Sequence, residues 1–318
     1  MRVFLAFLLL VAVAALHLLS PFGSLAEAWR IDPALGRTLL VELRLPRTLL
    51  ALGYGATLGI SGAALQALFA NPLASPDITG SSSGAAMGAV LGSYWLGIAS
   101  PLLLALWGAM GAGLALGLLV VLAGRRTDKV RLLLAGLAVS LAAGAATSLL
   151  LALAPSPFAF YDSFEWLMGS FTDRNLGQAA ALVPAAIACG LLLRRSRALD
   201  LMALGDDVLA SLGHRPRRIA IELVALSAIA VGACVSVCGA IGFVGLIAPV
   251  VARRMVRGHP GRAMVPAGLI GALLLLLADF ATRNVTLDHA IPVGVLTTLI
   301  GTPMFIAILL SMRGRMAS

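Results

Sequence analysis

Residues 78–124 read ITGSSSGAAMGAVLGSYWLGIASPLLLALWGAMGAGLALGLLVVLAG, a stretch of 47 residues without a single Asp, Glu, Lys or Arg. One membrane-spanning helix needs ~20 apolar residues, so the stretch is long enough for two. About a quarter of the residues in a soluble domain are charged. An uncharged run of this length therefore indicates a chain that lies in a lipid bilayer.

The composition of the rest of the chain agrees with this interpretation. Of the 318 residues, 60% are hydrophobic and 12% are charged, and the mean hydropathy is +1.00. Residues 48–76 and 223–252 are also uncharged. Strands of a membrane β-barrel would alternate in polarity over ~10-residue segments, whereas these runs are continuously apolar. The predicted fold class is an all-α polytopic membrane protein, with residues 1–318 forming a single transmembrane domain.

Pro, Gly and charged residues divide the chain into ten predicted membrane spans. The first span also resembles a signal peptide with a cleavage site at residues 26–28, but its single Arg and its long apolar stretch favour a retained helix. The eighth span is the shortest. The predicted spans are residues 3–19, 48–68, 81–98, 102–123, 132–153, 177–193, 219–240, 244–257, 264–281 and 292–311.

The distribution of basic residues predicts the orientation. With the N-terminus inside, 17 of the 23 Lys and Arg residues fall on the cytoplasmic side and six on the outer side. This bias follows the positive-inside rule and places both termini in the cytoplasm. The rule also explains the net charge of +9 without nucleic acid as a partner. The outer six are Arg30, Arg37, Arg44, Arg47, Arg174 and Arg283.

Several kinds of chemistry are excluded by what the chain lacks. The only lysine, Lys129, is followed by Val130, so the chain has no nucleotide-binding P-loop. Ionisable residues inside the spans are scarce, which disfavours a proton relay. Glu222 and Asp279 lie near span ends, and Arg283, four residues after Asp279, is expected to pair with it. The histidines are scattered and the cysteines lie in apolar stretches, so neither a metal site nor a catalytic residue is indicated.

Three groups of segments stand out between about residue 40 and the C-terminus. They are 44–47 (RLPR) with 61–74 (SGAALQALFANPLA), 199–205 (LDLMALG) with 209–213 (LASLG), and 239–249 (GAIGFVGLIAP) with 278–283 (ADFATR) and 292–294 (PVG). In this order they resemble the permease subunits of type II ABC importers, which take up ferric siderophores, haem and cobalamin. The family fold has ten helices per subunit and is a homodimer, which agrees with the ten predicted spans.

The resemblance assigns a docking role to Arg44, Arg47 and Arg283. In the family, arginines at the matching positions receive acidic side chains from the two lobes of a periplasmic binding protein. The planar guanidinium suits this role because it binds a carboxylate through two hydrogen bonds. The alternative is that Arg44 and Arg47 anchor a helix end at the lipid headgroups and that Arg283 pairs only with Asp279.

The resemblance also assigns residues at the cytoplasmic side. Residues 196–216 match the coupling helices that sit in a groove of the ATPase, with Leu199, Met202, Leu209 and Leu212 as apolar knobs and with glycines that end short helices. The alternative is a solvated loop. The assigned coupling residues are Leu199, Leu201, Leu204, Gly205, Leu209, Leu212 and Gly213. Asn71, Leu73, Lys129 and Val130 match segments near the family's cytoplasmic gates, and residues 166–171 match an outer segment.

The sequence thus predicts a non-enzymatic permease subunit of a metal-chelate importer in the bacterial inner membrane. It is expected to form a homodimer, to bind two ATPase subunits that carry ATP and Mg²⁺, to receive ligand from a periplasmic binding protein, and to hold no cofactor itself. Its path should be lined by small and apolar residues. Alternatives are an ion-gradient-driven secondary transporter and a membrane subunit without transport. The sequence does not choose among siderophore, haem and cobalamin.

Overall fold

The computed structural model describes residues 2–98, 100–124, 129–154, 156, 160–161, 164, 166–284 and 291–316, and regular structure in this part of the chain is helical throughout. Short π-helical segments at Leu39–Arg44 and Leu91–Trp95, and a 3₁₀ turn at Pro76–Thr79, adjoin the α-helices. The helices are α1 (Arg2–Leu19), α2 (Phe22–Ile31), α3 (Pro33–Thr38), α4 (Leu45–Leu68), α5 (Ser81–Val90), α6 (Pro101–Ala123), α7 (Lys129–Ala152), α9 (Leu176–Ala179), α10 (Leu182–Arg194), α11 (Ser196–Met202), α12 (Asp206–Ser211), α13 (Pro216–Cys238), α14 (Val244–Met255), α15 (Pro260–Asn284) and α16 (Val293–Met316).

The predicted multi-pass helical architecture is confirmed. In the described residues, six helices are long and apolar enough to cross a membrane, and a seventh results if α1 and α2, bent by 50°, count as one span. Helices also occupy the other predicted spans, but α5 and α14 have only 10 and 12 residues. The count of ten spans therefore stays a prediction. The six are Pro33–Leu68, Leu102–Ala123, Lys129–Ala152, Leu176–Arg194, Pro216–Cys238 and Pro260–Asn284.

Helix α4 lies at the centre of the bundle, packed against α15, α14, α13 and α10. Glycines allow the closest of these contacts. A β-carbon at Gly59 would overlap the backbone carbonyl of Ala267, and one at Gly62 would overlap that of Gly245. Because helices in lipid associate through close packing of small residues, these contacts explain the density of Gly and Ala in the spans.

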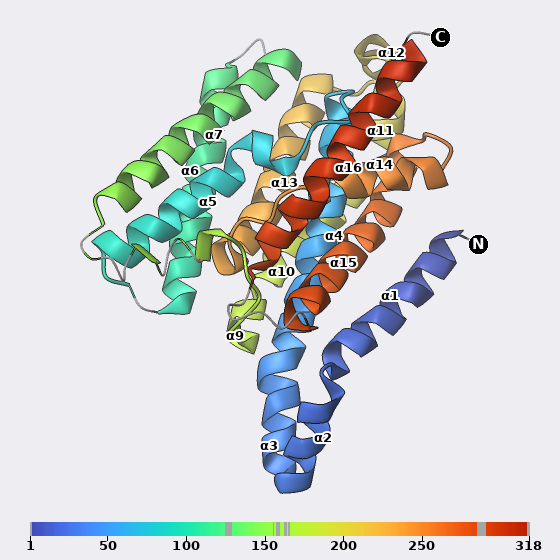
Figure 1. Cartoon of the computed structure of the whole chain (residues 1–318). Helices are drawn as coiled ribbons and strands as arrows, with labels where there is room; N and C mark the ends of the chain where they lie inside the picture. Colours follow the sequence, from blue (N-terminus) through green and yellow to red (C-terminus); the bar gives the residue numbers. More distant parts are fainter. Residues whose placement is uncertain are drawn as a thin grey trace.

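The two ends of the bundle carry different structures (Figure 1). The α2–α3 hairpin and the start of α4 project at one end, and α11, α12 and the C-terminus lie at the opposite end. By the predicted orientation these are the outer and cytoplasmic ends. Helix α1 packs against α15 and so joins the bundle beside the outer end of α4.

Most of the interior is apolar, in two clusters of buried residues. The cysteines belong to this packing: Cys234 and Cys238 are fully buried among Tyr54, Val235 and Leu276, and both are free thiols. Tyr54 meets Phe171 edge-on, with ring centroids 6.5 Å apart. Phe171 thereby fixes the end of segment 166–171 inside the bundle.

Candidate functional site

Asp279 is the centre of a buried polar cluster at the outer end. Its carboxylate accepts two hydrogen bonds from Arg47, from Nε to Oδ2 at 2.7 Å and from Nη2 to Oδ1 at 2.8 Å. The Asp279 side chain is 1% exposed and that of Arg47 is 18% exposed. A two-point pair of this kind is strong and directional. It fastens α4 to α15 at the position where the resemblance places docking arginines.

His17 is the second partner of Asp279. Its Nε2 lies 2.8 Å from Asp279 Oδ2, and its Nδ1 lies 2.9 Å from Thr48 Oγ1. The Thr48 hydroxyl also lies 2.8 Å from the carbonyl oxygen of Arg44. The fully buried ring is therefore held from α4 on one side and from α15 on the other, and it brings the end of α1 into the cluster.

Arg44 and Arg283 are bound to the end of α1. Arg283 donates to the carbonyls of His17 and Ser20, at 3.0 and 2.6 Å. Arg44 donates to the carbonyls of Leu19 and Pro21, at 2.7 and 3.0 Å, and also to Ser24 Oγ at 2.8 Å. Carbonyls at the C-terminus of a helix lack partners within the helix and carry its negative dipole end. The two arginines therefore cap α1 from α15 and from the segment that leads into α4.

The expected pairing of Arg283 with Asp279 is thus wrong, since Asp279 takes Arg47 and His17 as its partners. Spacing along one helix could not reveal two helices that approach from elsewhere. The structure does bring Arg44, Arg47 and Arg283 into one cluster, although Arg44 is only 4% exposed. His17 is a further member of the cluster that the sequence did not single out; the signal that marks it is an ionisable residue inside an apolar span.

At the cytoplasmic end, residues 196–216 form the two short helices expected from the sequence, α11 and α12. Gly205 and Gly213 lie at their ends with φ of +111° and +81°, a conformation that favours glycine. Leu199 and Leu209 are fully buried in the chain's own core. The large apolar residues open to a partner are Leu204, Val208 and Leu212, which are 66%, 39% and 56% exposed, whereas Leu201 is partly buried.

Polar contacts fasten these short helices to the bundle. Asp200 Oδ1 accepts a hydrogen bond from the backbone N–H of Gly261 at 2.8 Å, which ties α11 to the start of α15. Just before α11, Arg195 forms a forked ion pair with Glu222 of α13, with N–O distances of 2.8–3.0 Å. Arg195 is therefore the ion-pair partner of Glu222. The pair α11–α12 is held as one unit with α13 and α15.

The predicted gate residues do not come together in a single site. Asn71 follows α4, and its Oδ1 accepts from the backbone N–H of Leu73 at 2.9 Å, a short turn that reverses the chain. Lys129 begins α7 and pairs with Asp206 of α12 at 2.8 Å. Val130 is 63% exposed. Residues 125–128, which precede Lys129 in the loop before α7, lie outside the described residues.

Beyond the Asn71 turn, Asp77 accepts hydrogen bonds from Ser82 at 3.1 Å and from Ser75 at 3.5 Å. Loss of solvation raises the pKa of the Asp77 carboxyl above its ordinary value, although these hydrogen bonds act in the opposite direction. The carboxyl group of Asp77, in the turn between α4 and α5, therefore binds its proton more tightly in the folded chain than it would in water.

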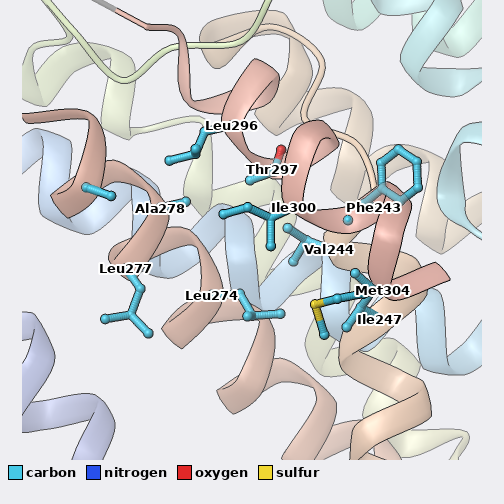
Figure 2. A pocket seen from close by; sticks show the side chains of 12 residues that line it. Phe243, Val244, Ile247, Leu274, Leu277, Ala278, Leu296, Thr297, Ile300 and Met304 are labelled. Carbon is cyan, nitrogen blue, oxygen red and sulfur yellow. The ribbon is translucent and has the colours of Figure 1, made fainter. Parts of the chain in front are cut away.

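Two cavities flank α16, and both are predominantly apolar. Figure 2 shows the smaller one, of about 160 Å³, with Ile247 of α14, Leu277 of α15 and Ile300 and Met304 of α16 among the side chains around it. The larger, of about 630 Å³, lies where segment 166–171 meets α16 and includes Met168, Ala240, Leu299 and Thr302. Neither is lined by an ionisable side chain among the described residues. The larger cavity has a mixed lining of small residues, larger apolar residues and two threonines, Thr298 and Thr302.

The sequence matches the FecCD transport family over residues 3–311. The hemin transport system permease protein of Yersinia pestis is 39% identical over 286 residues, which cover 86% of this chain and 83% of that protein. An Fe(3+)-citrate import system permease protein of Bacillus subtilis strain 168 is 35% identical over 279 residues, covering 85% of this chain and 81% of that protein.

Relatives of nearly full length and a solved structure extend this likeness. The iron(3+)-hydroxamate import system permease protein of Bacillus subtilis strain 168 is 35% identical over 324 residues, covering 96% of this chain and 95% of that protein. A metal-chelate type ABC transporter, solved in an inward-facing conformation, has a TM-score of 0.86 at 31% identity and covers 98% of this chain and 99% of that one. The likeness therefore includes both ends of the bundle.

Proposed function

The chain belongs to the FecCD transport family, and from this premise we propose that it is the membrane-spanning permease subunit of an ABC importer for a metal chelate. It is a multi-pass protein of the bacterial inner membrane. The observation that carries the proposal is the match to a metal-chelate type ABC transporter in fold, over 98% of this chain, and to hemin, ferric citrate and iron(3+)-hydroxamate permeases in sequence.

The membrane topology has ten spans with both termini in the cytoplasm. Helices at all ten predicted positions and the bias of basic residues toward one side support this count. The 12 residues of α14 extend ~18 Å, less than the ~30 Å hydrocarbon core. A short or irregular segment at membrane depth is tolerated where protein encloses it, and six of the 12 residues of α14 are buried.

The working importer is a dimer of this chain with two ATPase subunits inside and a binding protein outside. The ATPase subunits carry ATP and Mg²⁺, and the permease itself carries out no chemistry. The exposed Leu204, Val208 and Leu212 offer an apolar surface for the ATPase. At the other end, Arg47 is the arginine with a buried anchor and an exposed edge, suited to a carboxylate of the binding protein.

The transported species is a bulky chelate rather than a bare metal ion. A bare divalent or trivalent ion would need carboxylate, imidazole or thiolate ligands along its path. The cavity beside α16 is lined instead by Met168, Ala240, Leu299 and Thr302 with their apolar neighbours. Apolar walls with occasional hydroxyls bind a large, mostly shielded ligand without trapping it.

The proposal is tested by uptake into proteoliposomes. The permease is reconstituted with its ATPase, and chelate-loaded binding protein is added outside; radiolabelled ferric siderophore, hemin and ferric chloride are compared. ATP-dependent uptake of a chelate, lost with a hydrolysis-deficient ATPase and unaffected by ionophores, is expected. Uptake driven by an ion gradient without ATP would establish a secondary transporter, and uptake of the uncomplexed ion alone would overturn the chelate assignment.

A further inference from the structure

The outer arginines are bound in two different ways. Arg44 and Arg283 donate to backbone carbonyls at the end of α1 and to Ser24 Oγ, and these contacts fix their positions. Arg47 alone of the three is held by a side-chain carboxylate, that of Asp279. Its Nη1 has no hydrogen-bond partner among the described residues. Arg47 is therefore the arginine that can change partner without uncapping a helix.

A change of partner at Arg47 would threaten Asp279. The Asp279 carboxylate is 1% exposed, so losing its arginine would leave a buried charge without compensation. Removing one member of a buried ion pair is strongly destabilising for that reason. If Arg47 were the only partner of Asp279, it would thus be locked in place, and an incoming carboxylate would gain little from it.

His17 removes this obstacle. His17 Nε2 lies 2.8 Å from Asp279 Oδ2, the oxygen that also accepts from Arg47 Nε. Because an ionised carboxylate only accepts hydrogen bonds, the ring nitrogen is the donor, and the carboxylate keeps a partner when Arg47 turns away. The ring is held in this orientation by Thr48 Oγ1 at 2.9 Å from Nδ1. Because His17 belongs to α1 and Arg47 to α4, the two donors reach Asp279 independently.

We propose that His17 is a positioning residue for partner docking: it holds Asp279 so that Arg47 can exchange this internal carboxylate for one on the binding protein. The proposal rests on the docking role given to Arg47 above. In the absence of the binding protein, the carboxylate of Asp279 occupies the position on Arg47 that the partner's carboxylate would take. The approaching carboxylate meets Nη1 of Arg47 first, and Nη2 and Nε follow as they leave Asp279.

The first test needs no partner. The full permease in nanodiscs is treated with phenylglyoxal, which modifies accessible arginines, and modification of Arg47 is followed by mass spectrometry against the exposed Arg30 of α2 as an internal control. Asp279→Asn should raise the rate at Arg47 several-fold, because the internal carboxylate is lost. His17→Phe should lower it below the wild-type rate, because Arg47 becomes the sole partner of Asp279. An unchanged or higher rate in His17→Phe would overturn the exchange.

The second test is a double-mutant cycle on docking. Binding of the chelate-loaded binding protein is measured for the wild type, His17→Phe, Asp279→Asn and the double variant. We expect His17→Phe to weaken binding by about tenfold, the equivalent of 1.4 kcal/mol, and to have no effect when Asp279→Asn is present. If His17→Phe weakens binding equally in the wild type and in Asp279→Asn, then His17 acts only through packing and the proposal is refuted.

Two controls separate the possible failures. His17→Gln retains an N–H donor and should keep most of the binding, and monodispersity with ATPase co-purification checks folding of every variant. Arg47→Glu tests the docking role itself: unchanged binding there would remove the proposed docking site. If Arg47→Glu impairs binding, but His17→Phe has the same effect with and without Asp279→Asn, the docking role of Arg47 stands and only the proposed exchange of carboxylates is refuted.

Discussion

Lys129 Nζ lies 2.8 Å from Asp206 Oδ1, so the chain's only lysine joins the start of α7 to the second of the two short cytoplasmic helices. Lys129 belongs to the segment assigned to a gate, and α12 to the segment assigned to ATPase coupling. The two side chains are 29% and 47% exposed. An exposed pair of this kind contributes little to stability, ~0–1 kcal/mol. Its interest lies in the connection between the two segments.

Breaking this connection should affect coupling more than folding. In Lys129→Met we expect an unchanged melting temperature and a lower number of chelates transported per ATP hydrolysed. The charge-reversed double variant Lys129→Asp with Asp206→Lys should restore the ratio. A ratio equal to that of the wild type in the single variant would show that the ion pair is incidental.

The outer arginines should separate into a structural and a docking residue. Arg44→Ala removes three hydrogen bonds at a 4% exposed site, which should destabilise the subunit by about 2–4 kcal/mol. Arg47→Ala should weaken binding of the binding protein more than it weakens binding of the ATPase. Thermal melting in detergent and binding-protein titration measure the two effects; equal melting temperatures for Arg44→Ala and the wild type would contradict the capping role.

The coupling segment allows a matched comparison between an exposed and a buried leucine. Leu204→Asp adds charge at a 66% exposed position and should abolish co-purification of the ATPase while the permease remains folded. Leu199→Ala opens a cavity in the core and should destabilise the permease by about 2–5 kcal/mol. Retention of the ATPase by Leu204→Asp would place the contact elsewhere.

The packing of α4 on α15 depends on the absence of a side chain at Gly59. Gly59→Val should prevent folding or lower the melting temperature sharply, because its β-carbon would overlap the carbonyl of Ala267. Gly113→Ala in α6 is the matched control, since nothing lies within 4 Å of the added β-carbon. It should be neutral or slightly stabilising, as Ala has the higher helix propensity.

Asp77 should make stability depend on pH. Because its pKa is raised in the folded chain, the ionised form destabilises the fold above that pKa, and the penalty disappears as pH falls through it. We expect the advantage of Asp77→Asn over the wild type in melting temperature to grow from acidic to neutral pH. A difference that is constant across this range would rule out the charge as its cause.

The long helices could be predicted because their signal is local. Each apolar run of about 20 residues had to be helical, and their small residues indicated close packing, which Gly59 against Ala267 confirms. The helical structure of residues 33–44 was missed. Its signals were present, since Pro33 stands at the first position of α3 and Asp32 accepts from the Ala34 N–H at 2.8 Å.

The arrangement within the sites was beyond the sequence for a different reason. Leu199 and Leu204 have the same chemistry, yet one is fully buried and the other is 66% exposed, because α11 packs on α15 and the turn after it does not. Likewise, the partner of Asp279 could not be chosen from Arg283, four residues away, or Arg47, 232 residues away. Only the crossing of α1, α4 and α15 decides this, and no single segment encodes it.

The capping of α1 has a consequence for the biogenesis of the protein. Ser20 leaves the ribosome early, but the guanidinium that binds its carbonyl belongs to a residue 263 positions later. Helix α1 is therefore synthesised long before Arg283. The carbonyls that Arg283 binds lack this donor until almost the entire chain has been made. Arg283 belongs to the same polar cluster as Arg47. A partly synthesised or truncated subunit without Arg283 would therefore lack the complete cluster at this end of the bundle. The polar cluster at the end of α1 is therefore complete only once residue 283 has been synthesised.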